Sequence, residues 1–372
     1  MLLNAHIFGI GAAGNKACID LMRYLPELSN KITLVNTTMK DIPLEYRDKA
    51  IELSGPFKGC GKERKKANQI MFDNLKAGTL DYVYDPEDAF CIIVTSSEGG
   101  TGSGGSIMLA KYLANVYKMH IHFYIFTGFE DDGRSLKNTV DLFQEMEEDY
   151  TVQAISNIKF LELANGNRIK AEQLANEKFI EDIKILLGGF ICESDQNIDE
   201  SDLLKITKTP GYMVIERVDL GSIKNVKEFN TKLTDALDTS KNLEFEPTCK
   251  RYGVILNISE KVSDFIDYSN SILKSRCGVP FESFLHIQNI FQGNFMDIIV
   301  SGLKLPESEI LTTYNNFIES SKAVDVSKDE FFNLVMNTEA DDFDNLTKTD
   351  KVDVSKAKSE FFNDKKDASS VF

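Results

Sequence analysis

The sequence predicts an α/β protein: a parallel β-sheet domain with helices on both faces, a long central helix, and a second, smaller α/β domain. Three observations predict this class. Short apolar runs alternate with helical patterns, two glycine-rich turns directly follow such runs, and a long amphipathic stretch separates two alternating halves. The length of 372 residues exceeds that of most single cores, which also favours two domains.

The strands of the first half are predicted from runs rich in β-branched and aromatic residues. These runs are residues 5–10, 32–35, 90–95 and 121–127. Parallel strands gather their carboxyl ends at one edge of a sheet, where ligands bind in the connecting loops. GIGAAG at 9–14 follows the first run and SEGGTGSGG at 97–105 the third. We therefore expect both glycine-rich turns at the ligand edge.

The central helix is predicted from about residue 171 to 191, because five apolar side chains recur there at helical spacing. They are Ala175, Phe179, Ile183, Leu186 and Phe190. Such a helix spans about 30 Å. Strands are expected after it at 212–218, 252–258, 281–287 and 296–301, with helices at about 222–238, 261–274 and 307–321.

Residues 323–372 are predicted to be a disordered tail, because 12 acidic residues and 7 lysines accompany few aliphatic residues. VDVSKDEFFN at 324–333 returns there as VDVSKAKSEFFN at 352–363. We interpret the repeat as an interaction motif in two copies, since paired phenylalanines are costly to leave exposed. Low-complexity drift is the alternative.

Composition excludes several classes of protein. The formal charge of -16 repels nucleic-acid phosphates, so no direct nucleic-acid binding is expected. No apolar run approaches the roughly 20 residues that span a bilayer, and the amino-terminal segment lacks signal-peptide features. The 6 cysteines and 4 histidines form no metal-ligand pattern. We therefore expect free thiols, no membrane insertion, no protein-built metal site and a cytoplasmic location.

The turn at 97–105 joins a predicted strand to a helix, and it lacks the lysine of a Walker A loop. Its backbone N–H groups and two hydroxyls at a helix amino-terminus still form an arrangement that binds anions. These groups belong to Gly99, Gly100, Thr101, Gly102 and Ser103. We therefore expect phosphate to bind here without a lysine.

The turn GIGAAG permits another interpretation, because it fits the GxGxxG fingerprint of dinucleotide-binding proteins. That fingerprint also requires an acidic residue at the end of the second strand. Here the strand ends in Asn36 and Thr37. An enzyme dependent on a nicotinamide or flavin dinucleotide is therefore the alternative function.

EGGTGSGG resembles the signature loop of the tubulin/FtsZ superfamily, and the chain follows the order of this family over roughly residues 5–305. Five further segments resemble family motifs. They are GAAGN at 11–15 (first phosphate loop), VNT at 35–37 (loop after the second strand), SNIKFL at 156–161 and LAN at 174–176 (guanine-reading asparagines), and NIDESD at 197–202 (the FtsZ synergy loop). The compact centre and acidic tail look most like the TubZ/PhuZ branch of phage and plasmid proteins.

The resemblance implies a GTPase that polymerises into a cytoskeletal filament and moves or positions DNA or phage particles. Its ligands would be GTP or GDP with Mg²⁺, and its partner a second copy bound head to tail. The implied nucleotide contacts are Gly11, Ala12, Ala13, Asn15, Asn36, Gly99, Gly100, Thr101, Gly102, Ser103, Asp132, Arg134, Asn157 and Asn176. The implied domains are 1–168 (GTP-binding), 169–192 (central helix), 193–305 (activation, with the synergy loop), 306–322 (C-terminal helix) and 323–372 (tail).

The resemblance assigns catalysis to Asn197, Asp199 and Asp202. The central helix places them on the order of 30 Å from the phosphate turn, whereas general-base chemistry needs contact at about 3 Å. The active site is therefore expected to close only when the loop of one subunit docks onto the GTP of the next. A head-to-tail contact that does not close into a ring builds a filament. The alternative for NIDESD is a polar turn that caps the helix beginning near Asp202.

Some positions depart from the family pattern. Thr38 stands where FtsZ has aspartate, and Ala12 replaces a tubulin glutamine that helps to hold Mg²⁺. Glu130, Asp132 and Arg134 align in more than one way, and the loop at 55–62 matches the family's γ-phosphate loop only in its glycines. No residue is therefore assigned to a metal.

The tail segment EADDFDN at 339–345 carries Asp341, Asp342 and Asp344. We predict that this acidic cluster binds a basic surface on the neighbouring subunit or on an adaptor protein. A solvated tail is the alternative. A third functional possibility is a GTP-binding relative that assembles without hydrolysis.

Overall fold

We describe a computed structural model of the chain over residues 3–321, except for 56–57, 82–84, 86, 130–131, 192–197, 224 and 259–265. The side chains of 266–268 and 320–321 are also left aside. Asn197, the repeated tail motif and the acidic tail cluster lie outside the described residues.

Strands and helices alternate over most of the described chain, as the sequence predicts, except that α5, α6 and α7 follow one another and β9 is followed by β10. The strands are β1 (Ala5–Ile10), β2 (Ile32–Asn36), β3 (Ala50–Glu52), β4 (Phe90–Ser96), β5 (Ile121–Thr127), β6 (Thr151–Ser156), β7 (Gly211–Asp219), β8 (Arg251–Asn257), β9 (Glu282–Gln288) and β10 (Phe295–Leu303). The α-helices are α1 (Gly11–Tyr24), α2 (Arg64–Lys76), α3 (Gly100–Tyr117), α4 (Gly133–Gln144), α5 (Asn157–Leu163), α6 (Arg168–Leu186), α7 (Glu200–Thr207), α8 (Val226–Asp238), α9 (Ile266–Cys277) and α10 (Glu307–Ser321). Two 3-10 helices, Pro26–Lys31 and Leu44–Lys49, flank β2.

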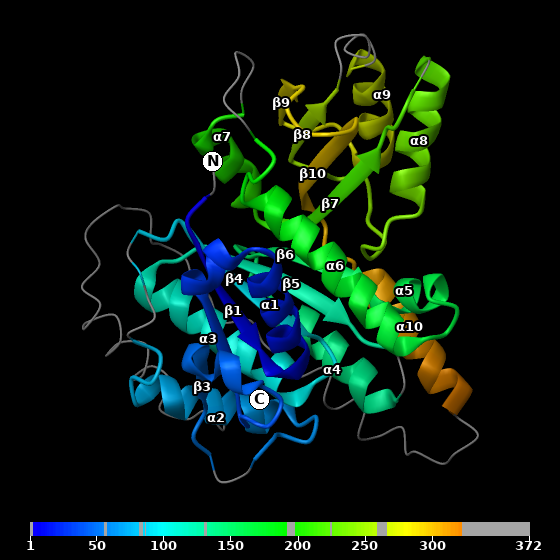
Figure 1. Cartoon of the computed structure of the whole chain (residues 1–372). Coiled ribbons are helices and arrows are strands. Elements are labelled where there is room, and N and C mark those ends of the chain that lie inside the picture. The colour runs from blue at the N-terminus through cyan, green and yellow to red at the C-terminus, as the bar shows by residue number, and fades with distance from the viewer. Residues whose placement is uncertain are drawn as a thin grey trace.

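The strands form one 10-stranded sheet in the order β3-β2-β1-β4-β5-β6-β7-β10-β8-β9 (Figure 1). The neighbours from β3 to β7 are all parallel, which confirms the predicted parallel sheet. β10 lies antiparallel between β7 and β8, and β9 lies parallel to β8. The two halves predicted from the sequence therefore meet in a single sheet, through a short pairing of Thr151–Gln153 in β6 with Gly211–Met213 in β7.

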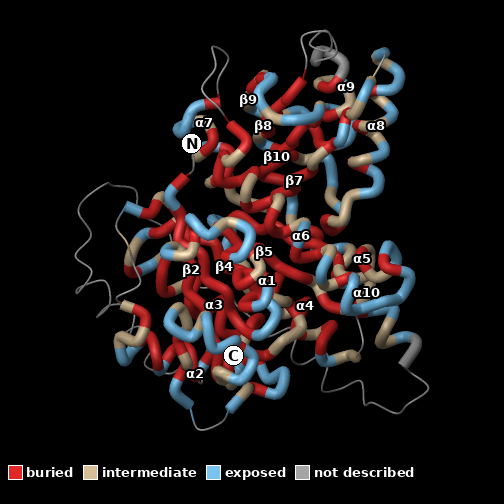
Figure 2. Tube along the Cα trace, viewed as in Figure 1, coloured by how far each residue is buried: buried red, intermediate tan, exposed pale blue. Residues whose placement is uncertain are grey.

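Both faces of the sheet are covered, so the strands are buried along most of their length (Figure 2). In β1, Ile7 packs into a core with α1, α6 and α7, whereas Phe8 and Ile10 pack into a second core with α2, α3 and α4. The second core continues through α8, α9 and α10. Two buried faces explain why these strands read as nearly continuous apolar runs in the sequence.

The central helix is shorter than predicted. It ends at Leu186 rather than near residue 191, because Gly188 adopts a left-handed backbone with φ of 80°. The N–H of Gly189 donates to Lys184 O at 2.8 Å and that of Gly188 to Ile185 O at 3.0 Å. These are the two hydrogen bonds of a Schellman motif, which terminates helices at glycine.

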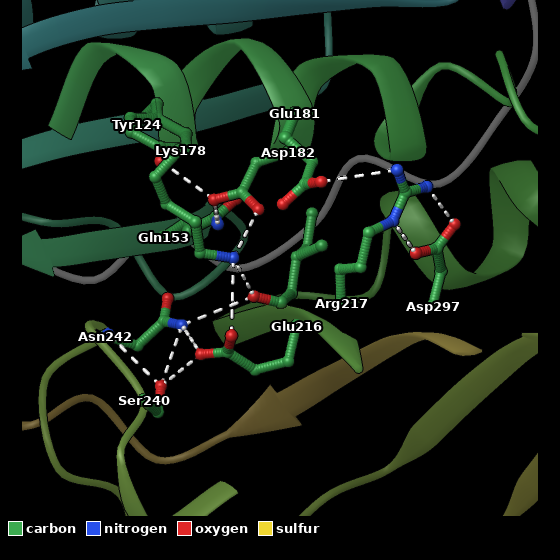
Figure 3. Close-up of polar contacts among 11 residues, drawn as sticks. Tyr124, Gln153, Lys178, Glu181, Asp182, Glu216, Arg217, Ser240, Asn242 and Asp297 are labelled. Carbon is green, nitrogen blue, oxygen red and sulfur yellow. Dashed lines mark hydrogen bonds and ion pairs between the residues drawn. The ribbon is translucent and has the colours of Figure 1, made fainter. Parts of the chain in front are cut away.

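A buried polar network joins α6 to the sheet (Figure 3). Lys178 Nζ donates to Asp182 Oδ1 and to the backbone of Ile215 in β7, each at 2.7 Å, and lies 3.4 Å from Glu216 Oε2. Tyr124 in β5 donates its hydroxyl to Asp182 Oδ2 at 2.8 Å. Burial raises the pKa of Asp182 to about 7, although the Lys178 ammonium opposes this shift. The central helix is thus bonded to strands from both halves of the chain.

A second ionic contact lies further along the same helix (Figure 3). Arg217 in β7 forms a two-point hydrogen bond with Asp297 in β10, at 2.6 and 2.7 Å, and lies 3.2 Å from Glu181 in α6. Its guanidinium also stacks over Phe190, 3.8 Å from the ring centroid. These contacts fix the carboxyl-terminal part of α6 against β7 and β10.

Replacing Lys178 with methionine is expected to leave Asp182 and Glu216 buried without their cation. Removing one partner of a buried ion pair costs about 3–5 kcal/mol. We therefore expect urea titration to show a loss of this size in the free energy of unfolding. The control is Lys137→Met, which breaks the more exposed Lys137–Asp141 pair and should cost less than about 1 kcal/mol. Equal losses in the two variants would contradict the stabilising role of the network.

Candidate functional site

The carboxyl ends of β1, β2, β4, β5 and β6 meet at one edge of the sheet, and four helices begin there (Figure 1). α1, α3, α4 and α5 start at Gly11, Gly100, Gly133 and Asn157. Because β2 and β4 lie on opposite sides of β1, this edge contains a switch point of the strand order, where open α/β sheets bind their ligands. The convergent helix amino-termini favour an anion.

The two glycine-rich turns contact each other at this edge. Gly11 has a φ of 74°, and a Cβ placed on it would lie 3.0 Å from the backbone nitrogen of Gly102. The hydroxyls of Thr37 and Thr101 are 3.2 Å apart, so the end of β2 also reaches the start of α3. The expected phosphate contacts Gly11, Thr101 and Gly102 are thus brought together by backbone packing.

Most of the glycine-rich run is helical, because α3 already begins at Gly100. A Cβ on Gly104 would lie 2.3 Å from Arg64 O at the start of α2. Arg64 in turn donates to Ser103 O at 3.2 Å and to Glu145 Oε2 at 2.9 Å. The glycines therefore allow α2 to pack directly on the backbone of α3.

Two of the predicted nucleotide contacts use their side chains for hydrogen bonds within the protein. Asn15 is fully buried. Its Nδ2 donates to Val35 O and its Oδ1 accepts from the N–H of Val35, so its side chain links α1 to β2. Ser103 is buried and donates its hydroxyl to Gly99 O. The N–H of Ser103 also donates to Gly99 O at 3.0 Å, so the side chains of both residues and this N–H are used within the protein.

Three other predicted nucleotide contacts lie near the ligand edge. Ala12 and Ala13 are exposed in the first turn of α1. Asn36 is buried, donates to Asp41 at 3.3 Å and accepts from the N–H of Thr37 at 2.9 Å. The local hydrogen bonds of Asn36 shape the turn after β2.

Asp132 caps α4 by accepting a hydrogen bond from the N–H of Ser135 at 2.9 Å. It also accepts one from Lys62 Nζ at 2.6 Å, a residue that sequence reasoning missed. The Lys62 ammonium, helped by the N–H of Ser135, lowers the pKa of Asp132 to about 2. Arg134 is exposed in the first turn of α4.

The two predicted guanine-reading asparagines lie on adjacent helices. Asn157 is the first residue of α5, and its Oδ1 is buried without a hydrogen-bond partner among the described residues. Asn176 in α6 is 7% exposed and donates its Nδ2 to Asp20 Oδ2 in α1 at 2.7 Å. Asp20, which was not predicted, thus binds the Nδ2 end of the Asn176 amide.

Asp199 and Asp202 lie at the opposite edge of the sheet. The 19 residues of α6 span about 28 Å from the ligand edge. The helix ends beside the amino end of β1, where the N–H of Leu3 donates to Leu187 O at 2.9 Å (Figure 1). Asp199 is exposed and caps α7 by accepting from the N–H of Asp202 at 2.8 Å, which confirms the capping interpretation. Asp202 accepts from Lys205 Nζ at 3.1 Å.

No group of three or more histidine, cysteine, aspartate or glutamate side chains among the described residues could hold a metal ion. No described helix has the length and apolar character needed to span a bilayer. The five described cysteines are free thiols, as predicted.

Comparison with known proteins supports the predicted family, although no family model matches the chain. The chain is 28% identical over 271 residues to the tubulin-like protein CetZ5 of Haloferax volcanii, a match that covers 62% of the chain. The matches span 66% of the length of CetZ5 and 53% of that of CetZ1 from the same organism.

Solved structures show the same fold. The TubZ of Clostridium botulinum phage c-st has a TM-score of 0.68 at 19% identity, covering 86% of this chain and 98% of that chain. A GTPγS-form protofilament of TubZ from Bacillus thuringiensis serovar israelensis has a TM-score of 0.73 at 14% identity, covering 89% and 94%. The dinucleotide-dependent enzyme is therefore not favoured.

Adjacent glycines in α3 give a test of the packing at the site. Gly104→Ala places a Cβ against the backbone of α2 and is expected to lower the free energy of unfolding by about 1–3 kcal/mol. A Cβ on Gly105 would make only ordinary contacts, with the Met71 side chain at 3.4 Å and Ala67 O at 3.9 Å, so Gly105→Ala should be neutral or stabilising by up to about 1 kcal/mol. Chemical denaturation measures both, and equal effects would contradict the described contact between α2 and α3.

Proposed function

Because the chain is a member of the tubulin/FtsZ superfamily related to TubZ and CetZ, we propose that it binds and hydrolyses GTP and polymerises head to tail into a cytoskeletal filament. One observation carries the proposal. The edge that carries the glycine-rich turns and the start of α7, with Asp199 and Asp202, lie at opposite edges of the sheet, separated by the length of α6.

In this proposal the triphosphate lies against the amino-termini of α1 and α3, where backbone N–H groups are offered by Gly11, Gly100 and Thr101. The guanine lies between α5 and α6, with its N–H donors facing the Oδ1 atoms of Asn157 and Asn176. Adenine presents an acceptor where guanine has its ring N–H. It would leave a buried acceptor unmatched at a cost of about 1–3 kcal/mol, so GTP is favoured over ATP.

Mg²⁺ is expected with the nucleotide, since it binds through one or two carboxylates together with substrate phosphates. The ligand edge offers oxygen donors of this kind. Thr101 contributes a half-buried hydroxyl, and the Glu98 carboxylate occupies the space above Gly128. When bound, the ion would neutralise phosphate charge beside these residues.

Hydrolysis requires a group that orients or deprotonates the attacking water at about 3 Å. We assign this role to Asp199 and Asp202, with Asn197 as a further member of the loop. About 28 Å of helix separates them from the phosphate site of their own chain. They would therefore act on the GTP of the neighbouring subunit, and this head-to-tail contact extends into a filament.

The acidic tail cluster at 339–345 is proposed to bind a basic surface on the next subunit or on an adaptor. A depression of about 650 Å³ beside α7 offers such a surface. It is lined in part by Lys205, Lys208 and Arg251. Its three cations outnumber its one lining carboxylate, Glu200, and this charge, opposite to that of the tail, supports the pairing.

For the biological role we propose that the filament moves or positions DNA or phage particles in the bacterial cytoplasm. The support is the likeness in fold to a phage TubZ. Fluorescence microscopy of the tagged chain in its host tests this role. Filaments that never contact the phage particle or replicon would contradict it.

The variant Asp199→Asn tests the assignment of catalysis. Asparagine caps helices as well as aspartate does, so α7 should remain folded while the carboxylate is lost. We expect GTP binding and the GTP-dependent rise in light scattering to persist, and phosphate release to fall about 100-fold or more. The control Glu200→Gln removes a neighbouring exposed charge and should retain turnover. Normal hydrolysis by Asp199→Asn would refute the shared site. Slow turnover of the unaltered chain in intact filaments would instead indicate a protein that assembles without hydrolysis.

Deletion of residues 323–372 tests the role of the tail. If the tail binds the neighbouring subunit, its removal should raise the critical concentration for assembly, measured by sedimentation at several protein concentrations. A milder variant, in which Asp341, Asp342 and Asp344 become asparagine, should reproduce most of the increase. An unchanged critical concentration would contradict binding of the tail to the neighbouring subunit and would favour a solvated tail.

A further inference from the structure

The C-terminal helix α10 packs against α4, the helix that starts at Gly133 on the ligand edge (Figure 1). Ile310 and Tyr314 of α10 are buried in the core that also holds Leu136 of α4. Phe317 follows them on the same helical face and packs against this core as a partly buried side chain. The last turns of α10 therefore lie along α4.

The ring of Phe317 lies directly on the first residue of α4. A Cβ on Gly133 would be 2.6 Å from Phe317 Cε1 and 3.3 Å from its Cζ. Two carbon atoms in contact prefer a separation of about 3.5–4.0 Å, so no side chain fits at position 133 while the ring stays in place. Glycine at this position is what permits the ring to pack on the backbone.

The first turn of α4 carries two of the predicted nucleotide contacts, Asp132 and Arg134, one on each side of Gly133. Asp132 accepts hydrogen bonds from the N–H groups of Ser135, at 2.9 Å, and of Leu136, at 3.1 Å. The first N–H groups of a helix, here those of Gly133 and Arg134, point out of its end. Phe317 therefore contacts the backbone exactly between the two groups expected to meet the ligand.

This contact joins the ligand edge to the end of the described chain. Close-packed side chains are hardly compressible and transmit displacements to their neighbours. Hydrogen bonds weaken steeply when donor and acceptor lose their distance or angle, so a small shift of the first turn of α4 is enough to weaken a bound ligand. α10 ends at Ser321, one turn beyond Phe317, and the tail follows it directly.

We propose that α10 is a positioning element for the nucleotide: Phe317 holds the first turn of α4 in the conformation that binds, and displacement of α10 weakens GTP and GDP alike. The inference rests on the proposed GTP site and deepens it by adding control from outside the site. A protein that bound the tail and drew α10 away from α4 would release the nucleotide. By linkage, bound nucleotide would hold α10 in place.

The test measures the dissociation constants of GTPγS and GDP for the full chain, at concentrations below assembly. Phe317→Ala is expected to weaken both nucleotides about 10-fold, since one or two hydrogen bonds to the ligand are worth this much. Phe317→Met refills most of the space and should restore both constants to within about 3-fold. The matched control, Ile310→Ala, removes a buried side chain of the same helix and should lower the urea midpoint while leaving both constants within about 2-fold.

Gly133→Ala probes the same contact from the side of α4. Alone it should weaken both nucleotides, because its Cβ forces the ring away. In the Phe317→Ala background it should add nothing, because no ring remains to be displaced.

Two results would overturn the inference. One is unchanged dissociation constants in Phe317→Ala, and the other is an equal loss of affinity in Ile310→Ala, which would mean that the contact only stabilises the fold. Unaltered chain that binds neither nucleotide would instead refute the proposed GTP site, and the inference with it.

Discussion

The length of the central helix is the constraint on which the account depends. α6 begins at the edge of the sheet where the glycine-rich turns meet and ends at the opposite edge, about 28 Å away. Proton transfer and water activation act over about 3 Å. No rearrangement of a few side chains can join the two edges within one subunit, whereas the proposed head-to-tail stacking would bring them together. The ionic contacts of Lys178 and Arg217 hold this helix against β7, and hydrogen bonds from Tyr124 and Gln153 to Asp182 hold it against β5 and β6.

Close backbone packing determines the chemistry at the ligand edge. Glycines at 11, 100, 102 and 104 let β1, α2 and the loop before α2 contact α3 directly. Hydrogen-bond donors and helix amino-termini therefore converge without side chains between them. The charged groups lie at the rim, where Lys62 and Asp132 neutralise each other in a half-exposed pair. In the proposed nucleotide site, phosphate would be bound mainly by backbone N–H groups.

Much of this arrangement could be predicted from the sequence because it depends on local patterns. The apolar runs of β1, β4 and β5 and the glycine turns after β1 and β4 appear in the structure at the expected residues. β6 was missed because its run TVQAIS contains three polar residues, all of them buried by the sheet. The end of α6 was placed too late, since the left-handed Gly188 interrupts an otherwise continuous apolar pattern. The roles of Asn15, Asp20 and Lys62 depend on partners 20, 156 and 70 residues away, which no local pattern reveals.

The most direct test of the central claim is the rate of GTP hydrolysis per subunit as a function of protein concentration, with the assembly state followed by analytical ultracentrifugation. The account predicts a rate close to zero while the chain is monomeric and a steep rise once head-to-tail contacts form. A rate per subunit that stays constant down to concentrations at which every molecule is a monomer would show that one chain completes its own active site, and would contradict the account.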